Sequence, residues 1–308
     1  MPRKGLFQEK IMLIRKFLGW EEAAFEDYKQ CYSNYGGNFS THPDVLTYIH
    51  SNADCSEKYF VHLTSGMVDG AVCVWDKNRL ANDLSTDSLT SHLSLPVAKN
   101  ELILPVTKEK NIIIPFKCKI VSPVNKNIVN RNEFFNARRS ICLTKDLKSF
   151  SRKTVQTRNR EVKKFINDGG SIIDQSVLSA KEMFNTFDFL FEMRRGKQKY
   201  NKGSVLSFIE KHRENFFGKI LYMNDTPCAF MLITKCESKG VNTLDFINIG
   251  INKEIKTHSL GTILMWVNIN EADKMFNTDC AKMRFSFGRP TFDYKNRWCY
   301  QEKLGKLL

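Results

Sequence analysis

The sequence has no long hydrophobic run. Its most apolar segments, such as 228–234, are short enough to be strands, whereas a membrane span needs roughly 20 apolar residues in a row. Near the N-terminus, Lys10, Arg15 and Lys16 interrupt the apolar residues, so the pattern of a signal peptide is missing. We therefore expect a cytoplasmic protein that meets a membrane only at its surface.

Paired cysteines are also missing. The nine cysteines are irregularly spaced, and no Cys-x-x-Cys occurs. An odd number of cysteines, with Cys73 and Cys228 inside apolar runs, indicates buried free thiols in a reducing compartment. Because paired ligand spacings are absent as well, we expect no metal site.

Acidic residues are scarce relative to basic ones. The 308 residues include 47 Lys and Arg against 33 Asp and Glu, which gives a formal net charge of +14. The excess is concentrated in residues 131–164 and 194–202. Such an excess of positive charge favours an anionic partner, namely nucleic acid, an anionic membrane surface or a phosphate-bearing cofactor. A solvated basic helix face gives the same pattern, so charge alone does not choose between them.

Two strand–turn–strand patterns recur far apart in the chain. Residues 58–80 and 219–234 each place β-rich runs on both sides of a turn rich in Gly, Asp, Asn or Pro, which predicts two hairpins. The recurrence predicts two related halves, over residues 21–149 and 150–308. Residues 1–20 would form a separate basic amphipathic segment.

That N-terminal segment has two interpretations. Phe7, Ile11, Ile14 and Leu18 fall at helical spacing with basic residues beside them. A first helix that packs on its own domain fits this pattern. An interfacial helix at an anionic membrane fits it too.

The C-terminal half has a regular order of predicted elements. The helices and strands that we expect lie at 148–168 (helix), 179–195 (helix), 219–234 (hairpin), 244–251 (strand), 259–276 (helix) and 282–287 (strand). Helices that alternate with strands in this way predict a mixed α/β domain.

The junction between the strand at 244–251 and the helix at 259–276 is a candidate phosphate site. The first turn of a helix presents unpaired backbone N–H groups and the positive end of the helix dipole, and both bind anions. A glycine there lets the ligand approach the backbone, and a lysine just before it adds charge. A simple helix cap is the alternative. The candidate residues are Lys256, Ser259, Leu260, Gly261 and Thr262.

These residues resemble a known motif. Lys256-x-x-Ser259-x-Gly261 has the spacing of the pyrophosphate-binding loop of the GNAT acyltransferases, with Lys as the first residue and Ser in place of the first glycine. The resemblance implies acyl-CoA as a donor.

Two further segments resemble the GNAT-like branch that includes the FemAB-type peptidoglycan aminoacyltransferases. They are the ending Gly288-Arg289…Asp293-Tyr294-Lys295…Trp298 and the segment Ser151-Arg152-Lys153-Thr154…Arg158-Asn159…Lys163-Lys164…Gly169-Gly170. This resemblance implies an α/β fold with a GNAT-like mixed sheet flanked by helices, in two tandem halves. It also implies aminoacyl-tRNA as the alternative donor.

The whole chain, from Tyr32-x-x-Tyr35-Gly36-Gly37 onwards, is similar to the macrophage-inducible Mig family of enteric bacteria. That resemblance implies a role in resistance to cationic antimicrobial peptides, at the inner membrane. The family has also been described as a transcriptional activator.

An acyl- or aminoacyltransferase must place a nucleophile near a carbonyl, stabilise an oxyanion and move one proton. On this hypothesis Tyr294 is the acid and Asp293 or Asp245 the base. The polar end of the last strand would contact substrate through Gly288, Arg289, Lys295 and Trp298. Each of these side chains could instead serve the core or an ion pair.

Two other functions fit the same sequence. The basic stretch 145–164 could follow the phosphate backbone of a nucleic acid, although the residues after Gly169-Gly170 are strand-like and not a recognition helix. A non-catalytic GNAT-like protein at a membrane is also possible, because fold does not establish catalysis. We favour the transferase.

Overall fold

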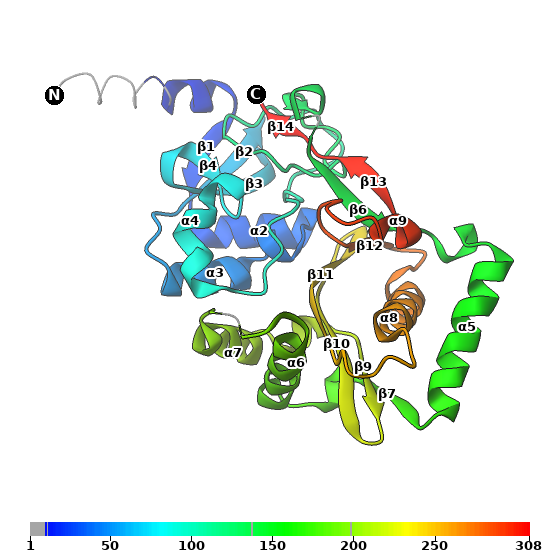
Figure 1. Ribbon diagram of the computed structural model, residues 1–308. Coiled ribbons are helices and arrows are strands. Elements are labelled where there is room, and N and C mark those ends of the chain that lie inside the picture. Colours follow the sequence, from blue (N-terminus) through cyan, green and yellow to red (C-terminus); the bar gives the residue numbers. More distant parts are fainter. Residues whose placement is uncertain (1–9, 11, 137, 198) are drawn as a thin grey trace.

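The computed structural model describes residues 10, 12–136, 138–197 and 199–308. It contains a small sheet in the N-terminal half and a large sheet in the C-terminal half (Figure 1). The small sheet is antiparallel, and its strands in spatial order are β1 (Trp20–Ala23), β2 (Lys58–Thr64), β3 (Met67–Trp75) and β4 (Arg79–Leu80). The hairpin predicted at 58–80 is thus present as β2 and β3.

Both faces of the small sheet are covered. The helices α2 (Phe25–Tyr35) and α3 (Pro43–Asn52) share a hydrophobic core with one face, and the loop-rich residues 102–128 share another with the opposite face. The N-terminal half is therefore mixed α/β, as expected. Short turns of helix, α4 (Asp87–Thr90) among them, interrupt the connection that follows.

The large sheet supplies the frame of the C-terminal half. Its eight strands run in the order β13-β6-β12-β11-β10-β9-β7, and β8 pairs with β10 off this path. Their bounds are β6 (Ser140–Thr144), β7 (Gly170–Asp174), β8 (Phe216–Phe217), β9 (Lys219–Met223), β10 (Thr226–Ser238), β11 (Val241–Ile251), β12 (Lys282–Ser286) and β13 (Cys299–Lys303). A separate two-stranded sheet joins β5 (Arg131–Asn132) to β14 (Lys306–Leu307).

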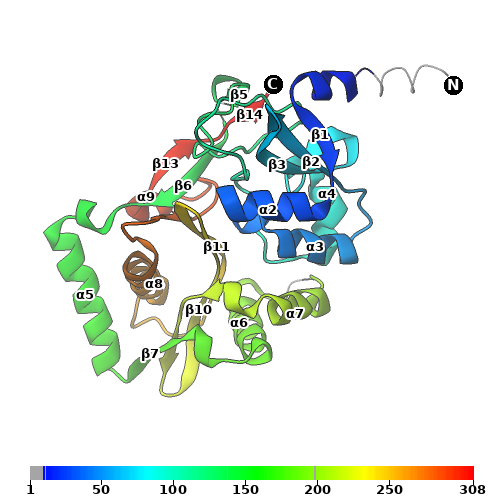
Figure 2. The same ribbon diagram turned by 180° about the vertical axis from the view of Figure 1, so that it is seen from behind.

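Helices cover the large sheet on both faces. On one face lie α8 (Leu260–Phe276) and, outside it, α5 (Arg152–Asn167). On the other lie α6 (Ala180–Arg195) and α7 (Lys202–Lys211), which also face the N-terminal half (Figure 2). Side chains of α6, α7 and β10 share one hydrophobic core with α2 and α3, so the two halves are packed together.

The predicted order of elements in residues 150–308 is confirmed, with shifts of a few residues at the ends. The sequence reasoning missed α7, the short α9 (Lys295–Trp298), β6 and β13. Because β6 precedes residue 150 yet lies between β12 and β13, it is held by strands far away in the sequence. The local sequence of β6 does not indicate which distant strands it pairs with. The domain limits remain a prediction.

The N-terminal segment lies only partly within the described residues. Phe7 and Ile11, part of its predicted apolar side, fall outside them. Ile14 and Phe17 are exposed, with Phe17 at 90%. Nowhere in the described part of the chain does a helix combine the length and apolar composition of a membrane span.

Two parallel strands of the large sheet separate partway along. The pairing of β11 with β12 ends at Asp245 and Ser286, but β11 continues to Ile251. Beyond that point the backbone N–H of Phe287 donates to the carbonyl oxygen of Cys142 in β6, the strand on the other side of β12. The chain after β12 therefore stays paired with β6 and leaves β11. We call the gap between the diverging strands the fork.

A β-bulge lies inside the fork. In the pairing of β10 with β11, Leu232 is opposite Asn248 and Ile233 is opposite Phe246, so Ile247 has no opposite residue. Bulges turn a strand locally and occur often beside active sites. The sequence analysis did not predict this bulge.

Gly250 sets the distance between α6 and the fork. A Cβ atom at Gly250 would lie 2.6 Å from Cβ of Leu190 and 2.7 Å from the backbone N of Phe191. Gly250→Ala should therefore lower the free energy of unfolding by about 1–3 kcal/mol, because the helix must move away. Urea unfolding measures this. Gly203→Ala, at an exposed position in α7, is the control and should stabilise by up to about 1 kcal/mol.

Candidate functional site

Two pockets lie on opposite faces of the large sheet near the fork. The first, the fork pocket, has a volume of about 800 Å³ and opens on the α6 side. Its lining residues are Asn100, Arg194, Arg195, Phe246, Ile247, Asn248, Ile249, Lys253, Phe287, Gly288, Arg289, Thr291, Phe292, Tyr294 and Lys295. The structure thus brings the predicted residues Gly288, Arg289, Tyr294 and Lys295 together.

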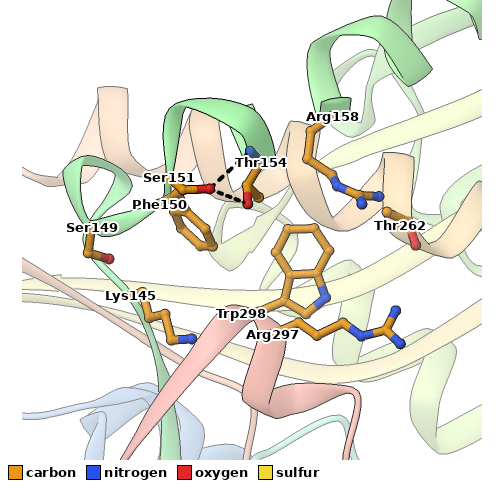
Figure 3. A pocket seen from close by; sticks show the side chains of 9 residues that line it. All are labelled: Lys145, Ser149, Phe150, Ser151, Thr154, Arg158, Thr262, Arg297 and Trp298. Carbon is orange, nitrogen blue, oxygen red and sulfur yellow. Dashed lines mark hydrogen bonds between the residues drawn. The ribbon is translucent and has the colours of Figure 1, made fainter. Parts of the chain in front are cut away.

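The second pocket, the α5 pocket, has a volume of about 370 Å³ and lies between α5, α8 and α9 (Figure 3). It is lined by Lys145, Ser149, Phe150, Ser151, Thr154, Arg158, Thr262, Arg297 and Trp298. The predicted residue Trp298 therefore lies apart from the fork pocket, and it shares this second pocket with Thr262 of the predicted phosphate loop.

Trp298 forms the floor of the α5 pocket. It is buried, and its ring packs with Phe150 and with Trp266 of α8. The guanidinium carbon of Arg158 lies 6.0 Å from the ring centroid of Trp298, and Figure 3 shows Arg158, Arg297 and Thr262 beside that ring. The cations and hydroxyl groups that line this pocket suit the phosphate group of a ligand.

The start of α8 keeps the local geometry of a helix N-terminus. The Ser259 carbonyl oxygen accepts from the backbone N–H groups of Thr262 and Ile263. Ser259 and Lys256 are exposed, Leu260 is buried, and the other two candidate residues are half-buried. Binding of a donor by this turn stays a prediction.

Tyr294 faces the fork pocket from the start of α9. Burial raises the pKa of its hydroxyl, and the nearby charge of Arg194 lowers it by less. The hydroxyl is consequently protonated at neutral pH and able to donate a proton. Its ring stacks on Phe292 with centroids 6.1 Å apart.

Lys295 holds the loop that leads from the fork to α9. Its ammonium is buried and donates to the carbonyl oxygens of Phe287, at 2.5 Å, and Arg289, at 2.6 Å. Gly288 within this loop has φ +68°, and a Cβ atom there would lie 2.9 Å from Nδ2 of Asn100. Lys295 thus positions Arg289, and its own contact with a substrate stays a prediction.

The two candidate bases differ in their surroundings. Asp293 is exposed beside Tyr294. Asp245 is buried at the base of the fork, where desolvation, and next the charge of Glu101, raise its pKa to about 7. Arg284 lowers that pKa, but its guanidinium is already paired with Glu101 and Glu302. Asp245 is not among the described residues that line the fork pocket.

The raised pKa of Asp245 makes stability depend on pH. The folded chain binds a proton at Asp245 up to about pH 7, whereas the unfolded chain releases it near its ordinary value of 3.8, so stability falls as pH rises between these values. Asp245→Asn should remove this loss, which is on the order of 2–4 kcal/mol. Denaturant unfolding at about pH 5 and 8 compares the two proteins. Asp279→Asn, at an exposed position, should show the same pH dependence of stability as wild type. If the free energy of unfolding of Asp245→Asn changed with pH as much as that of wild type, Asp245 would not be the group responsible.

Several lining residues were not predicted as site residues. The sequence had marked Arg194 and Arg195 only as part of a basic run, and Arg158 only as part of a resemblance. Asn100 had no signal at all, because it enters the fork pocket from the N-terminal half. Within the described residues, no group of three His, Cys, Asp or Glu side chains could hold a metal ion.

Comparisons with known proteins agree with this fold. A family model described as Mig-14 matches residues 42–307. No match is found among curated protein sequences. Among solved structures, FemX has 8% sequence identity and a TM-score of 0.57, and the match covers 94% of this chain and 97% of FemX. The likeness extends over both halves, and the prediction of a GNAT-like fold is confirmed.

Two other solved structures are similar over most of this chain. L-PGS from Bacillus licheniformis has 13% identity and a TM-score of 0.47, with 93% of this chain and 91% of L-PGS covered. A tandem GNAT protein from the clavulanic acid biosynthesis pathway has 9% identity and a TM-score of 0.45, with 93% and 97% covered.

Proposed function

We propose that this chain, which belongs to the Mig-14 family, transfers an acyl or aminoacyl group from a phosphate-bearing donor to an acceptor in the fork pocket. One observation carries the proposal: the short segment 288–298 lines both pockets. Tyr294 faces the fork pocket, and Arg297 and Trp298 line the α5 pocket. A donor on one face of the sheet and an acceptor on the other can therefore meet at the fork.

The chemistry needs only groups that lie at the fork. An amine or hydroxyl of the acceptor attacks the carbonyl carbon of the donor's thioester or ester, and a C–N or C–O bond forms. The bond from that carbon to the donor's sulfur or oxygen breaks, and the leaving group takes the proton of Tyr294. Asp293, Asp245 or water takes the proton of the nucleophile and returns one to Tyr294.

The backbone of the bulge is our candidate for stabilising the developing oxyanion. Ile247 and Asn248 lie beyond the last pair between β11 and β12, so β12 does not pair with them. Backbone N–H groups fixed in a strand need little reorganisation, which makes them effective oxyanion donors.

The donor would bind along the first turn of α8 and in the α5 pocket. The phosphate group would contact the backbone N–H of Gly261, because the N–H groups of Leu260 and Thr262 already donate to carbonyl oxygens. Arg158 and Arg297 would add charge. Both acyl-CoA and aminoacyl-tRNA carry such phosphates. The exposed basic residues of α5 favour the RNA, because a long polyanion can use them; they are Arg152, Lys153, Arg160, Lys163 and Lys164.

In the cell, the proposed activity contributes to resistance against cationic antimicrobial peptides, as the family resemblance implies. We place the protein in the cytoplasm, on the inner face of the inner membrane. Exposed Met12, Leu13 and Phe17 beside Arg15 and Lys16 would contact anionic lipid. Flotation with anionic vesicles tests this contact, and equal flotation after deletion of residues 1–20 would exclude that segment as the anchor.

Identification of a bound donor tests the transferase function most directly. Mass spectrometry of the purified protein should detect a retained acyl-CoA or an RNA. Calorimetry with coenzyme A, acetyl-CoA and aminoacyl-tRNA should then show which donor binds. If none binds, the chain is a non-catalytic GNAT-like protein.

A further inference from the structure

The fork pocket is lined by cations from four separate segments, and one of these cations, Lys295 of α9, is already bonded to two carbonyl oxygens. Arg194 and Arg195 end α6, Lys253 follows β11, and Arg289 follows the fork. Among the described residues that line this pocket, none is Asp or Glu. A concave surface of one charge sign concentrates ligands of the opposite sign, so the pocket favours an anion.

The helix dipole by itself could explain why two arginines end α6, but it does not explain the position of Arg194 on the pocket wall. Cations in the last turn of a helix are favoured by its dipole. However, Arg194 directs its Nη1 atom to the carbonyl oxygen of Ile249, 2.9 Å away on the pocket wall. Burial, and then the charge of Arg195, lower the pKa of Arg194. A bound anion would offset both the desolvation of the Arg194 guanidinium and its repulsion by Arg195.

Apolar surface lies beside these cations. Phe246 of β11 and Phe287 beyond β12 line the pocket from its two strands. Phe292 is 57% exposed and stacks on Tyr294. The exposed ring of Phe292 next to a basic pocket offers an apolar group a surface on which to pack.

Resting on the proposed function, which makes this pocket the acceptor site, we propose that the acceptor is a phosphate ester with an apolar portion. Its anionic group binds at Arg194, Arg289 and Lys253. Its apolar portion packs on Phe292, near the tyrosine that donates the proton. A lipid headgroup and a small soluble phosphate ester share the anionic chemistry, and binding measurements separate them.

Calorimetry on the full chain without donor tests this inference. The ligands are dihexanoyl phosphatidylglycerol as dissolved monomers, the matched dihexanoyl phosphatidylcholine, and glycerol 3-phosphate. We expect the anionic lipid to bind at least about tenfold more tightly than the zwitterionic one. The double variant Lys253→Gln/Arg289→Gln should weaken that binding by about tenfold or more.

A matched control removes the same charge elsewhere. Lys181→Gln/Lys274→Gln, at exposed positions on α6 and α8, should leave binding unchanged. Equal losses in both double variants would overturn the inference, because long-range attraction would then explain the binding. Circular dichroism confirms that each variant is folded.

The apolar portion has its own test. Phe292→Ser should weaken binding of the lipid and leave glycerol 3-phosphate unaffected. Equal affinity of wild type for both ligands would support the anionic site and overturn the apolar contact. Failure of every phosphate ester to bind would overturn the whole inference while the transferase function stood, because donor binding and transfer to a neutral amine are measured separately.

Discussion

Tyr294→Phe is expected to bind the donor like wild type and to transfer its acyl group about 10²–10⁴-fold more slowly. The change removes only the hydroxyl that faces the fork pocket. Because burial raises the pKa of that hydroxyl, it carries a proton at neutral pH and can give it to the leaving group. Single-turnover transfer from the donor identified by mass spectrometry measures the loss.

Tyr300→Phe is the matched control for this variant. Tyr300 lies on β13, is 46% exposed and is not among the described residues that line the fork pocket. Its loss should leave the rate unchanged. A Tyr294→Phe variant with the wild-type rate would remove Tyr294 from the mechanism, and equal loss of donor binding would instead indicate a structural role.

Gly261→Asp is expected to abolish donor binding. The position lies in the first turn of α8, where the proposed donor phosphate would bind, and the new side chain adds both bulk and negative charge. A Cβ atom there would lie 3.1 Å from the Cδ1 atom of Ile251, a methyl group that can move, so the fold should survive. Calorimetry with the donor, together with circular dichroism, measures both effects.

Two milder changes at the start of α8 test how much individual residues contribute to donor binding. Lys256→Ala should weaken donor binding by about 1–2 kcal/mol, the scale of one hydrogen bond to a charged group. Ser259→Gly restores the glycine usual in GNAT loops and should tighten coenzyme A binding if the serine side chain obstructs it. If Gly261→Asp binds the donor as tightly as wild type does, the phosphate lies elsewhere, and the α5 pocket alone becomes its site.

On the proposed function, the two pockets and the segment between them serve one reaction. The α5 pocket and the first turn of α8 would hold the donor's phosphates, its reactive carbonyl would lie at the fork, and the fork pocket would hold an anionic acceptor. Lys295 and Gly288 position the loop that separates the two ligands. The raised pKa of Asp245, at the base of the fork, makes the stability of this region measurable through its pH dependence.

The sequence by itself determined the order of elements and one group of site residues. Local patterns were enough for β10, β11 and α8, because alternation and helical spacing are properties of neighbouring residues. The end of β12 and the segment after it identified Gly288, Arg289 and Tyr294, which share the fork pocket because they are close in the chain.

Only the tertiary structure decided how those residues are divided between two pockets. Trp298 lies in a different pocket from Tyr294, although only three residues separate them, because α9 turns between the two faces of the sheet. Arg194 and Asn100 join the fork pocket from distant segments. The fork itself arises because the chain after β12 stays paired with β6 on one side and ends its pairing with β11 on the other. Long-range strand pairing of this kind leaves no trace in local periodicity.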